Sequence, residues 1–163
     1  MRVNLSDLTP EMLARLKPNK KQRHDRAAKV YPPSAFDLRP VDGGWVIWLP
    51  WPPSNNVYWR RYGHVVTIGP DGKAYRKAAH AFFAANPDVK FGDARLAVHM
   101  RLHAPTNRRY DLSNYWKCIE DSLVHAGVFD DDSQIDEHHA ERGMVMPGHG
   151  QAVVTIYTNR LKT

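Results

Sequence analysis

Apolar and polar residues alternate along the chain in a way that predicts the strands of a sheet. Between residues 94 and 104, apolar side chains alternate with basic ones, which is the pattern of a strand with one buried face. The apolar run at 45–49 predicts a buried strand, which the prolines that follow it cannot continue. Residues 134–141 and 151–158 predict two further strands.

Two other segments repeat their apolar residues at the spacing of a helix. Residues 72–85 place alanines and Phe82 on one side of the predicted helix. Residues 112–126 form a second such helix, followed by Gly127 at a position where glycine often ends helices. Its apolar face consists of Leu112, Trp116, Ile119 and Leu123. The order of elements predicts an α/β (α+β) fold, a single small domain with a mixed β-sheet packed by two main helices.

The beginning of the chain differs from this domain in composition. We predict that residues 1–43 form an N-terminal arm, partly helical or flexible, and that residues 44–163 form the folded domain. A short helix is expected to begin at Thr9-Pro10 and to end at Pro18. Bases are concentrated at and after its end: Lys17, Lys20, Lys21, Arg23, Arg26 and Lys29. The basic stretch has two interpretations, a contact with a phosphate backbone or a solvated linker.

The distribution of charge separates a basic body from an acidic patch. The chain has 163 residues and a net charge of +6, yet residues 111–141 carry nine acids and only one base, Lys117. This contrast suggests a protein that binds a polyanion and carries a metal site. The plainer alternative is a basic protein with one solvated acidic helix face.

Two features that the sequence lacks indicate the cellular compartment in which the protein is expected. No apolar run has the roughly 18 residues of a membrane span, and the N-terminus lacks the pattern of a signal peptide. Cys118 is the only cysteine, which excludes a disulfide framework and a cysteine-based zinc cluster. We therefore expect a cytoplasmic protein with no membrane partner.

The candidate chemistry is centred on the polar side of the 112–126 helix. Lys117 lies one turn before Asp121 on that side, and Asp131 and Asp132 follow the helix closely. Adjacent acids repel one another unless a cation neutralises them, and Mg²⁺ prefers carboxylate and water ligands. Lys117 is expected either to stabilise charge that develops on a phosphate or to help prepare an attacking water.

Other interpretations of the same acids remain open. Asp111 stands at the start of the helix, so the alternative to metal binding is that its carboxylate simply caps the helix. The acids between residues 130 and 141 match part of a calcium-binding loop. Ile135 occupies the position where that loop needs glycine, and no second helix follows, so magnesium is the better candidate.

The ordered motifs resemble those of the RusA family of Holliday junction resolvases. The first motif is Asp111-Leu112-Ser113-Asn114-x-x-Lys117, and the second ends in Asp131-Asp132-x-Gln134. The loop Pro52-Pro53-Ser54-x-Asn56-x-x-Trp59 looks like the family's N-terminal loop. The resemblance covers residues 45–158, and the set of motifs in order is more specific than any one of them.

This resemblance implies a homodimeric, Mg²⁺-dependent endodeoxyribonuclease that resolves four-way DNA junctions in recombination and repair. The catalytic residues would be Asp111, Lys117 and Asp132. The metal ligands would be Asp111, Ser113, Asp131 and Asp132. The DNA-binding candidates are Asn56, Trp59, Arg60, Arg61, Arg108, Arg109 and Asn114.

Two points limit what the resemblance implies. Ser113 stands where the family normally has an aspartate, which leaves two alternatives: a non-catalytic DNA-junction-binding protein with a weakened metal site, or a related flap or fork nuclease. The helix between Asp111 and Asp132 is also about 22 Å long. Residues 127–132 must run back along it to bring the acids together, or the site must combine acids from two subunits.

Overall fold

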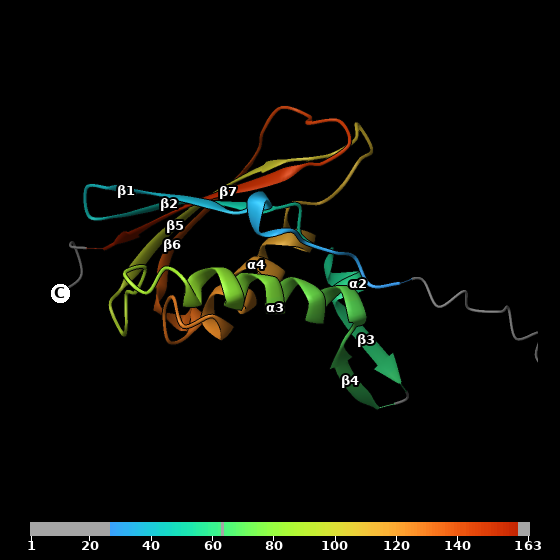
Figure 1. Ribbon diagram of the computed structural model, residues 1–163, viewed down its shortest axis with the longest axis horizontal. Coiled ribbons are helices and arrows are strands. Elements are labelled where there is room, and N and C mark those ends of the chain that lie inside the picture. The colour runs from blue at the N-terminus through green and yellow to red at the C-terminus, as the bar shows by residue number, and fades with distance from the viewer. Residues whose placement is uncertain (1–26, 63, 160–163) are drawn as a thin grey trace, which may run out of the picture.

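The computed structural model describes residues 27–62 and 64–159, which form a sheet with helices packed on one of its faces (Figure 1). The strands follow the order β1-β2-β7-β5-β6 across the sheet. They are β1 (Asp37–Val41), β2 (Gly44–Pro50), β5 (Leu96–His103), β6 (Ile135–Arg142) and β7 (Gln151–Thr158). β5 pairs antiparallel with β7 and parallel with β6, so the sheet is mixed, as the sequence predicts.

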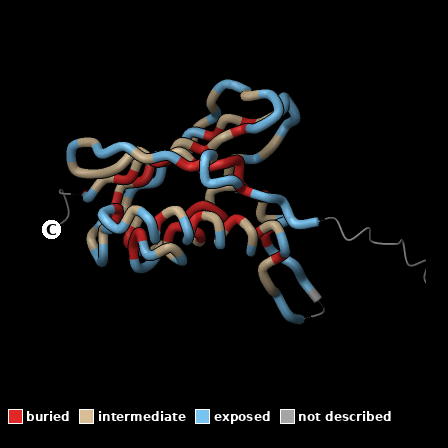
Figure 2. The backbone as a smooth tube through the Cα atoms, in the orientation of Figure 1, coloured by how far each residue is buried: buried red, intermediate tan, exposed pale blue. Residues whose placement is uncertain are grey.

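Helices α3 (Pro70–Ala84) and α4 (Ser113–His125) pack against each other and cover the same face of the sheet (Figure 1). The apolar residues of β5, spaced two apart, are buried, which confirms the alternation seen in the sequence. Ile119 and Leu123 of α4 are buried as predicted, whereas Leu112 and Trp116 are only partly covered. Figure 2 shows the buried positions concentrated between the sheet and the helices. These observations confirm the predicted fold class.

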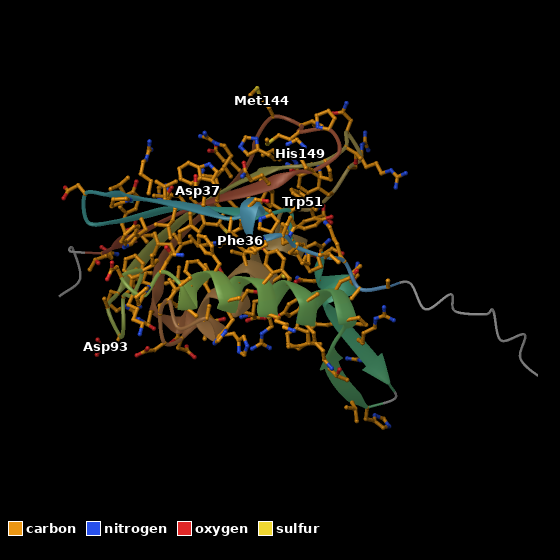
Figure 3. The ribbon with its side chains drawn as sticks, in the orientation of Figure 1. Phe36, Asp37, Trp51, Asp93, Met144 and His149 are labelled. Carbon is orange, nitrogen blue, oxygen red and sulfur yellow. The ribbon has the colours of Figure 1, made fainter. Side chains whose placement is uncertain are left out.

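The segment before residue 44 contributes more to the fold than the sequence predicts. Asp37–Val41, assigned to the arm, forms β1 and pairs along the whole of its length with β2. Before it, Pro33–Ala35 forms a single 3₁₀ turn, η2. Phe36, which is labelled in Figure 3, stacks on Phe82 of α3 with ring centroids 5.3 Å apart. Tyr31 meets Tyr75 edge to face at 5.0 Å. Residues 31–41 therefore belong to the folded domain, with Tyr31 and Phe36 in its core, and the expected helix from Thr9 lies outside the described residues.

The buried side of α3 also differs from the predicted one. The sequence favours a stripe that includes Ala74, Ala78 and Phe82, but the fully buried positions are Tyr75, Ala79 and Phe83. The large ring of Tyr75 decides this orientation. It is buried completely, and its hydroxyl donates to the Pro50 carbonyl at 3.2 Å.

A small hairpin, absent from the sequence prediction, extends away from the body of the protein (Figure 1). It follows the short helix α2 (Asn55–Tyr58) and consists of β3 (Trp59–Tyr62) and β4 (Val65–Ile68). Tyr58 is fully buried at its base, whereas Val65 and Val66 are 63% and 52% exposed. A two-stranded ribbon has little stability of its own, so this hairpin depends on its buried base.

No helix within the described part of the chain is long and apolar enough to cross a membrane.

Candidate active site

Helix α4 presents Lys117 to two carboxylates on the side away from the core. Lys117 Nζ lies 3.1 Å from Asp121 Oδ1, one turn further along the helix, and it also contacts Asp132 Oδ2. Partial burial acts to lower the pKa of Lys117, but the hydrogen bonds to Asp132 and Asp121 outweigh it and raise that pKa. Lys117 is therefore held as a cation, which suits it to stabilise negative charge rather than to accept a proton from water.

The segment after α4 runs back along the helix and brings Asp132 to Lys117. Gly127, with φ of 75°, adopts the left-handed conformation that ends the helix. Val128 and Phe129 are then buried, and the Val128 carbonyl accepts from the Phe91 amide at 2.8 Å. These contacts fix the path of the chain just before the two aspartates.

Adjacent Asp131 and Asp132 have different structural roles. Asp131 caps the 3₁₀ turn η3 (Asp132–Gln134), accepting from the Ser133 amide at 2.8 Å, and hydrogen bonds from Ser133 lower the pKa of Asp131. The buried Gln134 closes this capping box and donates to the carbonyls of Gly92 and Ala94. The turn thus anchors Asp131 and directs Asp132 toward Lys117.

We name the depression around this ion-pair cluster the Lys117 hollow. It has a volume of about 600 Å³. Its lining residues are Tyr58, Trp59, Arg76, Lys117, Asp121, Val124, His125, Asp131 and Asp132. Asp121 Oδ2 is buried there and has no hydrogen-bond partner among the described residues, so one carboxylate oxygen remains available to a cation or a donor.

Asp111 opens onto a different depression, which we name the Asp111 hollow. It also holds Arg108, Arg109 and Arg142. The preceding Tyr110 is fixed firmly, because its carbonyl accepts from Arg142 at 2.8 Å and its ring packs against Trp51. The N-cap position of α4 is Leu112 and no side chain caps the helix, so the capping interpretation of Asp111 is wrong.

The Asp111 and Lys117 hollows do not form one metal site within a subunit. Among the described residues, no group of three or more histidine, cysteine or acidic side chains is arranged to hold an ion. Lys117, Asp131 and Asp132 are brought together, whereas Asp111 is not among the residues around them. Ser113, exposed in the first turn of α4, lies two residues from Asp111, and its carbonyl accepts from Asn55 at 3.3 Å.

The predicted DNA contacts occupy three regions of the surface. Trp59 lines the Lys117 hollow, and the exposed Arg60 and Arg61 follow it on β3. Arg108 and Arg109 line the Asp111 hollow. Asn56 is exposed on α2 and Asn114 is half-buried in the first turn of α4. The basic candidates thus lie beside both hollows.

The sequence places Asp121 beside Lys117 but predicts no role for it, and it does not predict Arg76 or His125 in the site. The sequence does indicate that Asp121 is near Lys117, because residues four apart lie on the same face of a helix. Arg76 and His125 come from α3 and the end of α4, and only the packing of the two helices brings them to this hollow. No sequence spacing indicates their presence.

Glu120 is buried beneath the site, on the core side of α4. Its Oε1 lies 3.3 Å from His138 Nε2, and the Trp116 ring packs edge to face against the same histidine. Burial, with further contributions from Asp132 and Asp121, raises the pKa of Glu120 to about 7, while Lys117 opposes the shift. Burial also lowers the pKa of His138, so both groups favour their neutral forms.

Replacing Glu120 by glutamine is expected to stabilise the protein at pH 8 and to change little at pH 5. The folded state binds a proton on Glu120 more tightly than the unfolded state, so stability falls as pH rises from the ordinary pKa of 4.5 to about 7. Glutamine removes this loss, which is on the order of 3 kcal/mol. Thermal unfolding at the two pH values measures it, with Glu137→Gln on the exposed part of β6 as the control. An equal shift at both pH values would contradict the burial argument.

A cationic lysine held between carboxylates, with arginines nearby, has the composition of a site that handles phosphate esters. Comparison with known proteins agrees with this class. The family model described as Endodeoxyribonuclease RusA matches residues 50–157. A crossover junction endodeoxyribonuclease of Enterobacteria phage HK97 is 40% identical over 100 residues, which are 61% of this chain and 83% of that protein. The enzyme of the same name from Escherichia coli K12 is 35% identical over 111 residues, 68% of this chain and 91% of the relative.

The chain therefore belongs to the RusA endodeoxyribonuclease family. The matched region begins at residue 50, so η2, β1 and most of β2 lie before it. Among solved structures, a periplasmic domain of Helicobacter pylori MotB is 12% identical with a TM-score of 0.41, and the match covers 83% of this chain and 88% of that one. A likeness this distant does not bear on the function.

Proposed function

We propose that this protein is a divalent-metal-dependent endonuclease that cuts four-way DNA junctions. The observation that carries the proposal is the Lys117 hollow, where a charged lysine lies between Asp121 and Asp132 in a chain of this family. Its relatives are named crossover junction endodeoxyribonucleases. Lys117 would stabilise the negative charge that develops on the phosphate as the strand is cut.

The acidic residues fit a hard cation such as Mg²⁺. Their donors are carboxylate oxygens, and Asp121 Oδ2 has no partner in the described structure. We propose Asp111 and Asp132 as the main ligands, with Asp131 and the Ser113 hydroxyl as supporting ones. Mg²⁺ bound there would supply Lewis-acid polarisation of the phosphodiester. Lys117 would then exchange its contact with Asp132 for one with the DNA.

We further propose that the protein acts as a homodimer. A junction resolved symmetrically needs two equivalent sites, which a two-fold dimer provides. The separation of Asp111 from the Lys117 hollow supports a site in which each subunit contributes one part. A second copy would place its own Asp111 against the Lys117 hollow of the first.

A synthetic four-way junction tests the proposed function directly. We expect tight binding without metal and paired nicks near the crossover when Mg²⁺ is added, with linear duplex left uncut. The second candidate function, junction binding without cleavage, is favoured by Ser113 and would appear as binding with no nicks. Preferential cutting of flaps or forks would instead indicate a related nuclease.

Removing residues 1–26 is expected to weaken junction binding and flatten its salt dependence, but to leave cleavage at saturating protein unchanged. The deleted segment contains the bases from Lys17 to Arg26, which would contact phosphates without reading sequence. Titrations at several salt concentrations measure the effect.

The position where that deletion ends is important, because Tyr31 and Phe36 are part of the core and β1 is an edge strand of the sheet. A longer deletion, of residues 1–41, should lower the melting temperature, whereas the deletion of 1–26 should not. Unchanged salt dependence after the shorter deletion would show that the basic segment is only a solvated linker.

A further inference from the structure

The outer face of α3 carries a cluster of basic side chains that the proposed chemistry does not use. Lys73, Arg76, Lys77 and His80 share this face, because they are spaced three and four residues apart along the helix. His125, at the end of α4, meets His80 with ring centroids 5.7 Å apart. Together with Ile68 these residues line a depression of about 350 Å³, which we name the basic hollow.

No acid of the described part of the chain lines the basic hollow itself, although Arg76 also borders Asp121, Asp131 and Asp132 in the Lys117 hollow. Neither Lys73, Arg76 nor Lys77 forms an ion pair there, although Lys117 and Arg95 do. The one acid in the first turn of α3, Asp71, accepts instead from the backbone amide of Lys29 at 2.9 Å. The basic hollow therefore holds positive charge that is free to meet an anion.

Arg76 offers the donor in this cluster that is best placed to bind an anion. Its Nε is buried and has no hydrogen-bond partner in the described structure. A buried guanidinium nitrogen left unpaired is costly, so such groups are normally satisfied by protein, water or a ligand. Burial is the main cause that lowers the pKa of the neighbouring His125, and Arg76 and His80 lower it further.

The basic hollow continues directly into the Lys117 hollow. Arg76 and His125 line both depressions. A strand held in the Lys117 hollow would therefore pass Arg76 and reach Lys73 and Lys77 without leaving the surface. The base of the β3–β4 hairpin borders both hollows, through Trp59 in one and Ile68 in the other.

We propose that the basic hollow binds backbone phosphates of the DNA strand that is cut, beside the scissile phosphate rather than at it. This subsite rests on the proposed nuclease function. Lys73 and Lys77 would each contact a phosphate, and Arg76 would use its unpaired Nε to orient the backbone where it enters the Lys117 hollow. Such contacts set register and affinity without reading sequence.

The double variant Lys73→Ala/Lys77→Ala tests the subsite. Both lysines are exposed, so the fold should tolerate their loss. Binding of a labelled four-way junction is measured in EDTA over a series of salt concentrations. The logarithm of the affinity falls linearly with the logarithm of the salt concentration. Each lost phosphate contact makes this line less steep by about 0.9, so the double variant should make it less steep by about 1.8. Nicking in Mg²⁺ at subsaturating protein should fall by about the same factor as junction affinity, because both lysines would hold the strand that is cut.

The matched control removes the same charge elsewhere. Arg39→Ala/Lys90→Ala deletes two exposed bases, on β1 and on the loop after α3, that do not line either hollow. Its slope should stay near that of the parent. If both double variants change the slope equally, only overall charge matters and the subsite is wrong, while the nuclease proposal stands. If the parent itself binds no junction, both proposals are wrong.

Discussion

Mixing the Asp111→Asn and Asp132→Asn variants is expected to restore nicking of a four-way junction that neither variant cuts alone. Each substitution removes a carboxylate charge but keeps the side-chain shape, so each variant should still bind the junction. The two acids open into separate hollows of one subunit, which makes a site shared between subunits the simplest arrangement. In a mixed dimer, one site would then receive both substitutions and the other would be intact.

The size of the recovery follows from random exchange. In an equal mixture half of the dimers are mixed, and each has one intact site, so nicking should return to about a quarter of the parent rate. Two-strand resolution should recover much less, because a mixed dimer cuts only one strand. The assay therefore scores nicked and resolved products separately.

A second mixture provides the control. Asp132→Asn and Lys117→Met both alter the Lys117 hollow, where the two side chains contact each other within one subunit. Their mixed dimers would have no intact site and should stay inactive. No recovery with the Asp111 and Asp132 variants, after tagged subunits are shown to exchange, would place both acids in a site built within one subunit.

The part of this site that the sequence predicts is the part fixed by local geometry. Helical spacing gives the orientation of α4, and Gly127 marks its end. Only a few residues then separate the helix from Asp132, so the chain has few ways to run, and Lys117 is within reach. The motif positions Asp131 and Gln134 also have a local reason, since they form the capping box of η3.

The parts that the sequence misses depend on contacts between distant segments. β1 contains Pro40 and lacks a clear alternation, and it becomes a strand only because β2 offers it an edge. In α3, alanines on several sides leave the buried face undecided until Tyr75 packs against Tyr31. Arg76 joins the Lys117 hollow through the packing of α3 on α4, for which the sequence has no local signal.

Ser113→Asp is expected to lower the Mg²⁺ concentration needed for half-maximal nicking by about tenfold, or to create nicking if the parent only binds. A serine hydroxyl can contact a hard cation but brings no negative charge, and charge on oxygen ligands supplies much of the attraction. Ser113 is exposed at the start of α4, two residues from Asp111, so an aspartate fits there without disturbing the core. A Mg²⁺ titration of nicking on a fixed junction compares the variant with the parent.

The same substitution has a second expected effect, which does not depend on metal. The first turn of α4 contains no acidic residue, and an aspartate there would interact favourably with the positive end of the helix dipole. We expect a gain of about 0.3–1 kcal/mol in stability, measured by thermal unfolding in EDTA. Ser113→Asn separates the two effects, because asparagine supplies an oxygen of similar reach without charge and should change neither the Mg²⁺ requirement nor the helix dipole interaction. If the aspartate variant is more stable but needs as much Mg²⁺ as the parent, residue 113 does not face the metal, and another residue already supplies the charge that the family's aspartate would bring.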